Sequence, residues 1–465
     1  MPLLTDSSEW KRYEVYVIFS IQMFPLYEIF LSHPIVTTDT RDCPAGSIFF
    51  ALKGETFNGN EFAAQALEKG CAYAVIDDAR FCPKDDDRYI LVSDVLSTMQ
   101  QLATFHRRQL VTPILQVTGT NGKTTTKELC AAVLSQKYNV LYTQGNLNNH
   151  IGVPKTLLRL TPQHDIAVIE TGANHPGEIA MLSDIVDADC GLITNVGKAH
   201  LEGFGSFEGV VRTKGELYDH LRRSAEERRN THRQQPFIFL DADNPHLQAI
   251  AEGLPSYTYG HIGGGAYVEG EVSACDPFVS VRWRSGESGD NIFEVHTKLI
   301  GAYNLPNILA AVSVGLRFTV SPQQICAALE EYAPTNSRSE LRTTEHNRLI
   351  VDAYNANPTS MAAALDNFRI IPHAHKMLVL GAMRELGEAS EGEHMKIARQ
   401  AADIGAEAVW FVGEEFRAAA EAEHFEWFPD VEAVKQYLQD NPIKDRLILV
   451  KGSNSTRLWQ LPECL

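Results

Sequence analysis

Short apolar runs alternate with polar turns and amphipathic stretches along most of this 465-residue chain. Between residues 25 and 110, apolar runs at 47–52 (SIFFAL) and 72–76 (AYAVI) flank a helical stretch at 61–69. Apolar runs of this length, bounded by turn residues, are typical of buried strands. The first region is therefore predicted to form a small α/β module.

From residue 112 onward the pattern changes to repeated strand–turn–helix units. A β-branched run at 114–118 is followed by a glycine turn at 119–122 and a helical pattern, and further strands are predicted at 166–169 and 191–194. Alternation of this kind favours a mostly parallel sheet with helices on both faces.

Two stretches interrupt this pattern before it returns in the last third of the chain. The charges at 222–235 predict a surface loop or a frayed helix end, and the pattern at 258–300 predicts short strands in a small β appendage. From residue 321 the alternation resumes, which predicts a doubly wound, Rossmann-like α/β domain. Its predicted strands are 349–351, 377–380, 409–412 and 447–450.

The whole pattern predicts an α/β protein of three domains. We expect a small N-terminal α/β domain at 23–110, a central domain at 111–320 and a C-terminal Rossmann-like domain at 321–465. A chain of 465 residues with 44% hydrophobic residues and no low-complexity tract is long and apolar enough for several cores. This composition excludes wholesale disorder.

Net charge and cysteine usage narrow the possible partners. The formal net charge of -18 argues against a nucleic-acid binder that relies on a broad basic face. It leaves anionic small substrates possible, because a few local lysines and Mg²⁺ ions outweigh a distant acidic surface. The eight cysteines contain no CxxC pair, so reduced thiols are expected rather than a zinc site or a redox motif.

An apolar run near the N-terminus, residues 15–24 (VYVIFSIQMF), bears on localisation. It has about half the ~20 residues that a membrane-spanning helix needs. No small-residue cleavage site follows it, which argues against a signal peptide. Residues 1–22 are either an upstream extension or a part of the fold, and the sequence leaves both open. We expect the chain to be a cytoplasmic monomer without membrane partners.

The strongest chemical signal lies between the strand at 114–118 and the following helix. Its glycines let backbone amides turn inward, and the helix N-terminus presents N–H groups and a positive dipole end to phosphate. Lys123 adds a positive charge, and the Thr124 hydroxyl suits Mg²⁺. The strict P-loop pattern has glycine where this chain has Val117. We predict a P-loop-type nucleotide site; the alternative is an ordinary turn capped by Thr and Asn. The residues of the predicted nucleotide site are Gly119, Thr120, Asn121, Gly122, Lys123, Thr124 and Thr125.

Three further candidates follow predicted strands of the central domain. Glu170 ends the strand at 166–169, where its carboxylate could ligate a metal over the phosphates. His200 and Lys214 follow the strand at 191–194. Taken singly, each has an ordinary alternative: a solvated loop carboxylate, a hydrogen-bonded structural histidine and a surface lysine.

Several longer strings together resemble the Mur ligase family, from about residue 34 to the end. In the central domain they are TGTNGKTTT (118–126), GNLNNHIGVP (145–154), ETGANHPGEI (170–179), NVGKAHLEGFGS (195–206), TKGEL (213–217) and GAYNLPNILAA (301–311). In the C-terminal domain they are VDAYNANPTSM (351–361) and VKGSNSTRL (450–458).

Strings that differ between members of the Mur ligase family indicate which activity the resemblance implies. The opening string at 38–62 (TDTRDCPAGSIFFALKGETFNGNEF), ANHPGEI and DAYNANPTSM are similar to members that join D-alanyl-D-alanine to a UDP-muramoyl tripeptide. The loop at 382–386 (AMREL) lacks the Asp-Asn-Pro-Arg string of the members that add the third residue. Folylpolyglutamate synthetases share the P-loop but not the opening string. A ligase with another acceptor and a non-catalytic nucleotide-binding regulator remain as alternatives.

The resemblance implies ATP and two Mg²⁺ ions as cofactors, with Lys214 converted by CO₂ into a carbamate that ligates metal. The implied metal ligands are Thr124, Glu170, His200 and Lys214. The implied catalytic residues are Lys123, Asn149, Glu170, His200, Lys214 and Asp352. Besides the P-loop, the implied nucleotide-binding residues are Asn304, Asn307, Arg338, Asp352 and Tyr354.

The resemblance also implies where the other substrates bind. Thr40, Arg41 and Lys53 would hold the uridine diphosphate, because Arg and Lys beside a glycine suit a diphosphate. Asn149 would lie near the reacting centre, and the implied dipeptide residues are Tyr354 and Asn355. Arg41 could instead form a surface salt bridge, and Asp352 could instead cap a helix. Whether the tripeptide ends in diaminopimelate or lysine stays open.

Overall fold

The computed structural model describes residues 23–229, 233–286, 291–334 and 339–465. These residues divide into two compact units. The first unit contains residues 23–114, 139–171 and 181–188, and the second contains residues 115–138, 172–180 and 189–465 where described. The expectations for residues 1–22 and for Arg338 fall outside the described residues.

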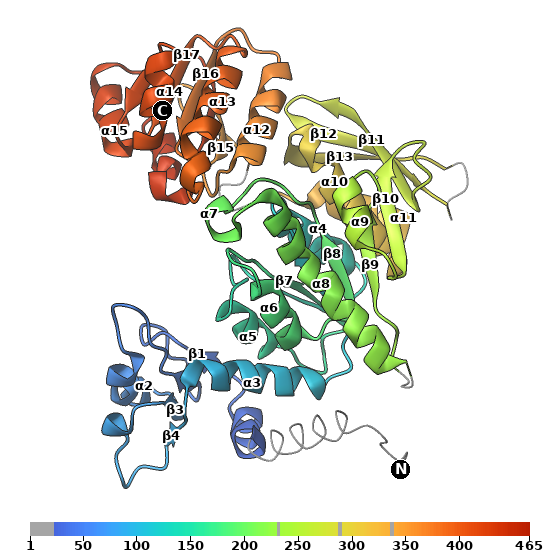
Figure 1. Ribbon diagram of the computed structural model, residues 1–465, viewed down its shortest axis with the longest axis vertical. Helices are drawn as coiled ribbons and strands as arrows, with labels where there is room; N and C mark the ends of the chain where they lie inside the picture. The colour runs from blue at the N-terminus through green and yellow to red at the C-terminus, as the bar shows by residue number, and fades with distance from the viewer. Residues whose placement is uncertain (1–22, 230–232, 287–290, 335–338) are drawn as a thin grey trace. The chain divides into compact units, whose positions relative to one another are not determined.

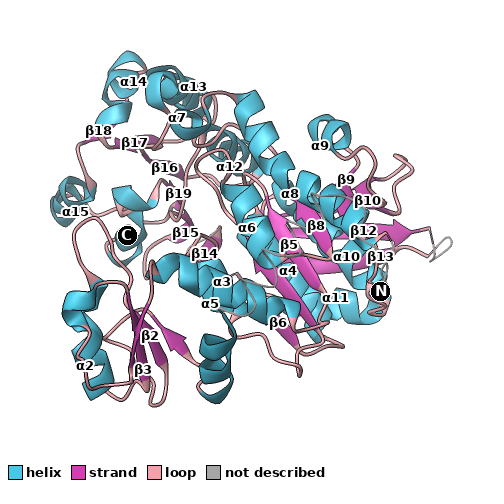
Figure 2. Cartoon of the chain, turned by 60° about the horizontal axis from the view of Figure 1, so that its bottom comes forward, coloured by secondary structure: helices cyan, strands magenta, loops and turns pink. Residues whose placement is uncertain are grey.

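The first unit begins with a parallel sheet in the order β1-β2-β3-β4. Its strands are β1 (Val36–Thr37), β2 (Ile48–Phe50), β3 (Tyr73–Ile76) and β4 (Tyr89–Leu91). Its helices are a helical segment at 23–32, η1 (Gly59–Phe62), α2 (Ala63–Glu68), η2 (Ala79–Phe81) and α3 (Val95–Arg108). Figure 2 shows β2 and β3 side by side, with α2 next to them. The predicted α/β module is confirmed, although its predicted helix is divided between η1 and α2.

The rest of the first unit packs around helix α3. Its elements are β6 (Val140–Tyr142), α5 (Gly152–Leu157), β7 (Ile166–Glu170) and the end of α6 (Glu178–Val186). Helix α3 packs against α5, and β6 pairs in parallel with β7. Arg107 of α3 is buried and donates to the carbonyl oxygens of Val186 at 3.2 Å and Asp187 at 3.1 Å. A guanidinium at these carbonyls stabilises the C-terminal end of α6.

Most of the central sheet belongs to the second unit, in the order β13-β12-β11-β10-β9-β8-β5. Its strands are β5 (Ile114–Thr118), β8 (Cys190–Ile193), β9 (Phe237–Asp241), β10 (Ser256–His261), β11 (Val268–Cys275), β12 (Phe278–Ser285) and β13 (Phe293–Ile300). Strands β5 to β11 pair in parallel, and β11, β12 and β13 pair in antiparallel. The strands predicted at 258–300 are confirmed, and because β10 pairs with β9, the small β appendage continues the main sheet.

Helices cover both faces of this sheet (Figure 1). The helices are α4 (Lys123–Ser135), α8 (Phe207–Arg228), α9 (Pro245–Ile250), α10 (Leu305–Arg317) and α11 (Pro322–Glu331). The short helices α7 (Leu201–Phe204) and η3 (Ala302–Asn304) pack against other helices. A side chain at Gly191 of β8 would meet Leu217 and Leu221 of α8, whereas one at Gly270 of β11 would meet Leu309 of α10. The strand pairing puts Gly191 on the same face as Glu269, the neighbour of Gly270. Successive strand residues point to opposite faces. The predicted parallel sheet with helices on both faces is therefore confirmed.

The C-terminal part of the second unit has a second sheet, in the order β14-β15-β19-β16-β17-β18. Its strands are β14 (Glu340–Thr343), β15 (Arg348–Asp352), β16 (Lys376–Gly381), β17 (Ala408–Val412), β18 (Glu426–Phe428) and β19 (Leu447–Lys451). Only β14 runs antiparallel to its neighbour. The four predicted strands are confirmed, whereas β14 and β18 were too short to give a clear pattern.

Two hydrophobic clusters hold helices against the two faces of this second sheet. Its helices are α12 (Pro358–Ile370), η4 (Gly387–Ala389), α13 (Ser390–Ala402), η5 (Glu414–Phe416), α14 (Arg417–Ala422), α15 (Val431–Asp440), η6 (Asn454–Thr456) and η7 (Leu458–Glu463). Ile350 packs in the cluster with α12, α13 and α14, whereas Leu349 and Val351 pack in the cluster with α15 and η7. The alternation along β15 confirms the Rossmann-like layering that the sequence predicts.

The charged run at 222–235 contains the end of helix α8, which continues as far as Arg228, in agreement with the helix-end alternative. Arg228 is buried, and its guanidinium lies 2.8 Å from the carboxylate of Asp189 and 3.2 Å from the carbonyl of Gln234. Hydrophobicity cannot separate a buried arginine from its exposed neighbours, so the sequence pattern missed this contact. Among the described helices, none is both long and apolar enough to cross a membrane.

Replacement of Asp189 by Asn should destabilise the second unit. The change removes the carboxylate charge that lies 2.8 Å from the buried Arg228 guanidinium, which costs about 3 kcal/mol. Urea unfolding of the wild type and of Asp189→Asn should show this difference as a lower midpoint. The matched control is Arg229→Gln, because Arg229 is exposed and follows Arg228 directly. Equal midpoints for wild type and Asp189→Asn would contradict the stabilising role of the pair.

Candidate functional site

The phosphate loop connects β5 to α4 and requires glycine at both of its turns. Gly119 has φ 144° and Gly122 has φ 75°, in the region that favours glycine. A Cβ at Gly119 would come within 2.0 Å of Thr194 Oγ1, and a Cβ at Gly122 within 2.6 Å of Asn307 Oδ1. Conformation and close contact therefore both exclude other residues, and the loop backbone lies directly against β8 and α10.

Hydrogen bonds from the end of β8 fix this backbone. The Thr120 N–H donates to the Asn195 carbonyl at 2.9 Å, and the Asn121 N–H donates to Asn195 Oδ1 at 3.0 Å. Thr194 Oγ1 and Asn195 Nδ2 both donate to the Asn121 carbonyl, at 2.6 and 2.9 Å. The loop is therefore preorganised before any ligand binds.

Lys123 begins helix α4 and folds back over the loop. Its ammonium donates to the carbonyls of Gly119 at 2.8 Å and Thr120 at 3.0 Å. The next residue, Thr124, is buried at the first turn of the helix, and Thr125 is partly exposed. A lysine charge beside the positive end of a helix creates a strong local attraction for phosphate.

Asn304 and Asn307 support the loop from α10. Asn307 accepts a hydrogen bond from Thr126 Oγ1 at 3.1 Å and donates to Asn304 Oδ1 at 2.8 Å. Asn304 in turn donates to the Ile300 carbonyl at 2.9 Å. Both amides are buried and link the first turn of α4 to α10.

Lys214 is almost completely buried on helix α8. Its ammonium lies 3.4 Å from the Ala173 carbonyl and 5.3 Å from the ring centre of Phe204. Burial, followed by the charge of Lys123, lowers the pKa of Lys214 from 10.5 to about 7. A substantial fraction of Lys214 is therefore a neutral, nucleophilic amine near neutral pH.

Two carboxylates hold the segment that faces Lys214. Glu216 accepts from the N–H groups of Gly177 at 2.8 Å and Ala180 at 2.9 Å, around the start of α6. Glu178 accepts from the Asn174 N–H at 2.7 Å. These contacts fix the backbone that carries the Ala173 carbonyl.

His200 lies at the start of α7 in a left-handed conformation, with φ 49°. Its Nδ1 contacts the carboxylate of Glu385, a residue that is also left-handed, with φ 60°. Burial lowers the pKa of His200; Glu385 opposes this effect, and Lys123 and Lys214 add to it. Lys123, His200 and Lys214 therefore lie within electrostatic reach of one another in the second unit.

Asp352 ends β15 in the C-terminal sheet, beside Lys451 at the end of β19. Their charged atoms are 2.5 Å apart, and Lys451 also donates to the Asn355 carbonyl at 3.5 Å. Lys451 is buried, whereas Tyr354 and Asn355 are more accessible. The carboxyl ends of adjacent parallel strands are where α/β sheets bind ligands.

Glu170 ends β7 in the first unit and is almost fully buried. Its Oε1 accepts from Asn148 Nδ2 at 2.8 Å, and its backbone N–H donates to Thr143 Oγ1 at 2.9 Å. Asn149 instead accepts from the N–H groups of Ile151 and Gly152, at 3.1 and 2.9 Å. Of the two adjacent asparagines, Asn148 therefore contacts the candidate metal ligand, and Asn149 fixes the start of α5.

Three family models match successive parts of the chain. The model described as "Mur ligase family, catalytic domain" matches residues 34–107, "Mur ligase middle domain" matches 117–315, and "Mur ligase, glutamate ligase domain" matches 337–454. The chain is 34% identical to the UDP-N-acetylmuramoyl-tripeptide–D-alanyl-D-alanine ligase of Bacillus subtilis (strain 168), over 94% of each protein. The chain belongs to the Mur ligase family.

Two further comparisons cover nearly the whole of this Mur ligase. The ligase of the same name from Escherichia coli (strain K12) is 34% identical over 92% of this chain and 93% of that protein. The crystal structure of MurF from Acinetobacter baumannii superposes with a TM-score of 0.79 at 30% identity, covering 92% of each chain. The resemblance inferred from the sequence and the three-domain α/β architecture are both confirmed.

Three residues of this Mur ligase were expected at a uridine diphosphate site, and all three lie in the first unit. Thr40 accepts at its carbonyl from Lys69 Nζ at 2.7 Å. The Arg41 guanidinium is largely exposed, and its contact with Asp39 at 2.7 Å lowers the pKa of that carboxyl to about 2. This contact is the surface salt bridge that the sequence left as the alternative for Arg41. The third expected residue, Lys53, pairs with Asp77 at 2.8 Å.

Sequence reasoning missed several residues that hold the site together. They are Asn148, Thr194, Asn195, Glu385 and Lys451. A polar residue at the end of a predicted strand was a usable signal for Thr194, Asn195 and Lys451. Nothing in the string Asn148-Asn149 distinguishes which amide contacts Glu170.

Replacement of Gly122 by Ala should disrupt the loop of this Mur ligase. The new Cβ would meet Asn307, so we expect ATP binding to weaken at least tenfold, by about 1.4 kcal/mol or more. Calorimetric titration with ATP would measure the change. The control is Gly253→Ala, which has a similar φ of 81° but nothing within 4 Å of the new Cβ. Equal affinities for both variants would contradict the steric argument.

The low pKa of Lys214 should make stability depend on pH. Between the folded value of about 7 and the ordinary value of 10.5, the unfolded chain binds a proton that the folded chain does not. Stability should therefore rise with pH in this window, by about 1 kcal/mol per pH unit relative to Lys214→Met. Urea unfolding of both proteins from pH 7 to 9.5 would test this. Parallel pH profiles would contradict the depressed pKa.

Proposed function

We propose that this Mur ligase joins D-alanyl-D-alanine to UDP-N-acetylmuramoyl-tripeptide, with conversion of ATP to ADP and phosphate. The main support is the near-full-length similarity to ligases of that name, at 34% identity over 94% of the chain. The preorganised phosphate loop with Lys123 supplies the site such a reaction needs. Formation of this amide would complete a peptidoglycan pentapeptide precursor.

The reaction would proceed in two displacements. The terminal carboxylate of the tripeptide attacks the γ-phosphorus, the bond to the ADP oxygen breaks, and an acyl phosphate forms. The amine of D-alanyl-D-alanine then attacks the acyl carbon, and phosphate leaves as the amide forms and the amine loses a proton. Lys123 and the loop amides stabilise charge on the transferring phosphoryl group.

The donor set fits Mg²⁺, which would neutralise phosphate charge when bound. The Thr124 hydroxyl and the Glu170 carboxylate are hard oxygen donors of the kind that Mg²⁺ prefers. Among the described residues, no group of three His, Cys, Asp or Glu side chains could hold a metal by itself. His200 would serve a second Mg²⁺ ion.

We also propose that Lys214 is carbamylated. As an ammonium it would repel a metal ion, but a neutral amine attacks the carbon of CO₂ and releases a proton. The product is an anionic carbamate with oxygen donors. The burial of Lys214 and the pKa of about 7 of its amine support this reaction, because CO₂ reacts only with the neutral amine.

The remaining residues are proposed for substrate positions. Thr40, Arg41 and Lys53 would contact the uridine diphosphate, and Asn304 and Asn307 the nucleotide. Asn149 would support the reacting centre through the backbone that also carries Asn148. The residues proposed for nucleotide and dipeptide in the C-terminal domain are Arg338, Asp352, Tyr354 and Asn355.

We propose a monomer that acts in the cytoplasm on small molecules without nucleic-acid or membrane partners. We also propose domain boundaries near residue 110 and just after α11, later than the boundary at 320 that the sequence predicts. The family models at 34–107, 117–315 and 337–454 support this division. Helix α11 packs against β13 and α4, which favours a second boundary that follows α11.

ADP formation measured with each tripeptide and D-alanyl-D-alanine tests the proposal. We expect dipeptide-dependent ADP release with UDP-muramoyl tripeptides that end in diaminopimelate or in lysine, and the preferred one identifies the substrate. Lys123→Ala should reduce this release at least about 1,000-fold, because it removes a charge that acts on the transferring phosphoryl group. Lys137→Met is the control, since Lys137 is exposed and contacts only Thr319 and the Tyr138 ring among the contacts described.

The alternatives give different outcomes in the same assay. A ligase with another acceptor would release ADP only with a different amine or peptide. A nucleotide-binding regulator would bind ATP without any amine-dependent release. Substantial activity of Lys123→Ala would reject the assignment of the phosphate loop.

A further inference from the structure

A lysine–aspartate pair lies at the carboxyl end of the N-terminal sheet. Asp77 follows β3 directly, and Lys53 lies three residues after the adjacent parallel strand β2. The Lys53 ammonium is 2.8 Å from Asp77 Oδ1. The side chain of Asp77 is 7% exposed, whereas that of Lys53 is 50% exposed. One partner is thus held by the fold, and the other faces solvent.

Asp77 is fixed by three further hydrogen bonds. Its Oδ1 accepts from Asn60 Nδ2 at 2.9 Å, and its Oδ2 accepts from the Val95 N–H at 3.3 Å, at the start of α3. Its own N–H donates to Asn60 Oδ1 at 3.0 Å. Asn60 is buried and is held in turn by Asn58. The carboxylate therefore has a single position, set by η1, β3 and α3.

Lys53 lies at the base of a tight turn. Lys53 and Asn58 form a β-bridge, and the Gly54 N–H donates to the Phe57 carbonyl at 3.0 Å. The exposed Phe57 ring packs over Gly54, and a Cβ at Gly54 would lie 2.3 Å from that ring unless the ring moved. The backbone of Lys53 is thus ordered, but its four-carbon side chain would sample many rotamers without a partner.

We propose that Asp77 is a positioning residue that holds the Lys53 ammonium in place for the diphosphate of the UDP-linked substrate. The inference rests on the proposed function, and on Lys53 as a substrate residue. An ammonium has three N–H donors, so contact with Asp77 leaves donors for phosphate oxygens. Fixing the lysine in advance removes an ordering cost that substrate binding would otherwise bear.

Asp77→Asn tests this role, because the amide keeps the shape and the acceptor for Asn60 but loses the charge that holds Lys53. It also gives up the 3.3 Å contact with the Val95 N–H, so urea unfolding of the variant accompanies the kinetic test. We expect KM for the UDP-muramoyl tripeptide to rise about fivefold. Both kcat and KM for ATP should stay within about twofold of wild type, since the proposed role of Asp77 concerns the UDP-linked substrate alone. Calorimetric binding of the UDP-linked substrate without ATP should weaken by the same factor.

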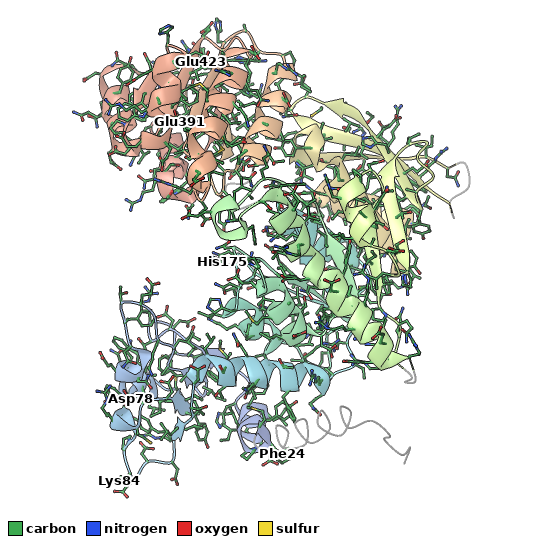
Figure 3. All side chains as sticks on the ribbon, viewed as in Figure 1. Phe24, Asp78, Lys84, His175, Glu391 and Glu423 are labelled. Atoms are coloured by element: carbon green, nitrogen blue, oxygen red, sulfur yellow. The ribbon has the colours of Figure 1, made fainter. Side chains whose placement is uncertain are left out.

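A double-mutant cycle separates positioning from a general structural effect. Lys53→Met should raise KM for the UDP-linked substrate at least as much as Asp77→Asn does. If Asp77 acts through Lys53, Asp77→Asn should change this KM by less than about twofold in the Lys53→Met background. The matched control is Asp78→Asn: Asp78 is the next residue, is labelled in Figure 3 and pairs with Arg80 at 2.6 Å.

The outcomes distinguish this inference from the proposed function. An unchanged or lowered KM in Asp77→Asn, or an equal rise in both backgrounds, would overturn the positioning role. If Asp77→Asn fails to fold, Asp77→Glu provides the same test, because it keeps the charge and displaces it by one methylene. A wild type without dipeptide-dependent ADP release would instead reject the proposed function.

Discussion

The structure of the second unit depends on the close approach of the phosphate-loop backbone to β8 and α10. This approach leaves no room for a Cβ at Gly119 or Gly122, and the groups that exclude it, on Thr194 and Asn307, also belong to the polar network beneath the loop. Steric exclusion and hydrogen bonding therefore act on the same few atoms. The result is a backbone turn at the start of α4 that is fixed by the protein's own contacts, as the proposed phosphate site requires.

Two lysines of the second unit, Lys123 and Lys214, have different environments and are therefore suited to different chemistry. Lys123 is partly exposed and contacts the loop carbonyls, whereas Lys214 is buried against a carbonyl and an aromatic ring. Burial and the charge of Lys123 together give Lys214 a pKa of about 7. One lysine is thus suited to binding phosphate, and the other to nucleophilic chemistry.

The N-terminal and C-terminal sheets each have a lysine–aspartate ion pair at the carboxyl ends of two adjacent parallel strands. In each, a lysine at or just beyond the end of one parallel strand pairs with an aspartate at the end of its neighbour: Lys53 with Asp77, and Lys451 with Asp352. The burial is reversed, because Asp77 is the more buried partner in the first pair and Lys451 in the second. Each pair fixes a charged group at the edge where α/β sheets bind ligands.

The sequence by itself determined the parallel sheets and the phosphate loop, because apolar periodicity and glycine placement are local properties of the chain. It also determined the family, through strings spread over most of the length. Tertiary structure alone decided that Asn148 rather than Asn149 contacts Glu170, that Arg228 is buried, and that Asp77 holds Lys53. These contacts depend on which strand ends become neighbours and on which face of a helix is covered. Neither property leaves a pattern in the local sequence, since the contacting residues are separated along the chain and are joined only by the fold.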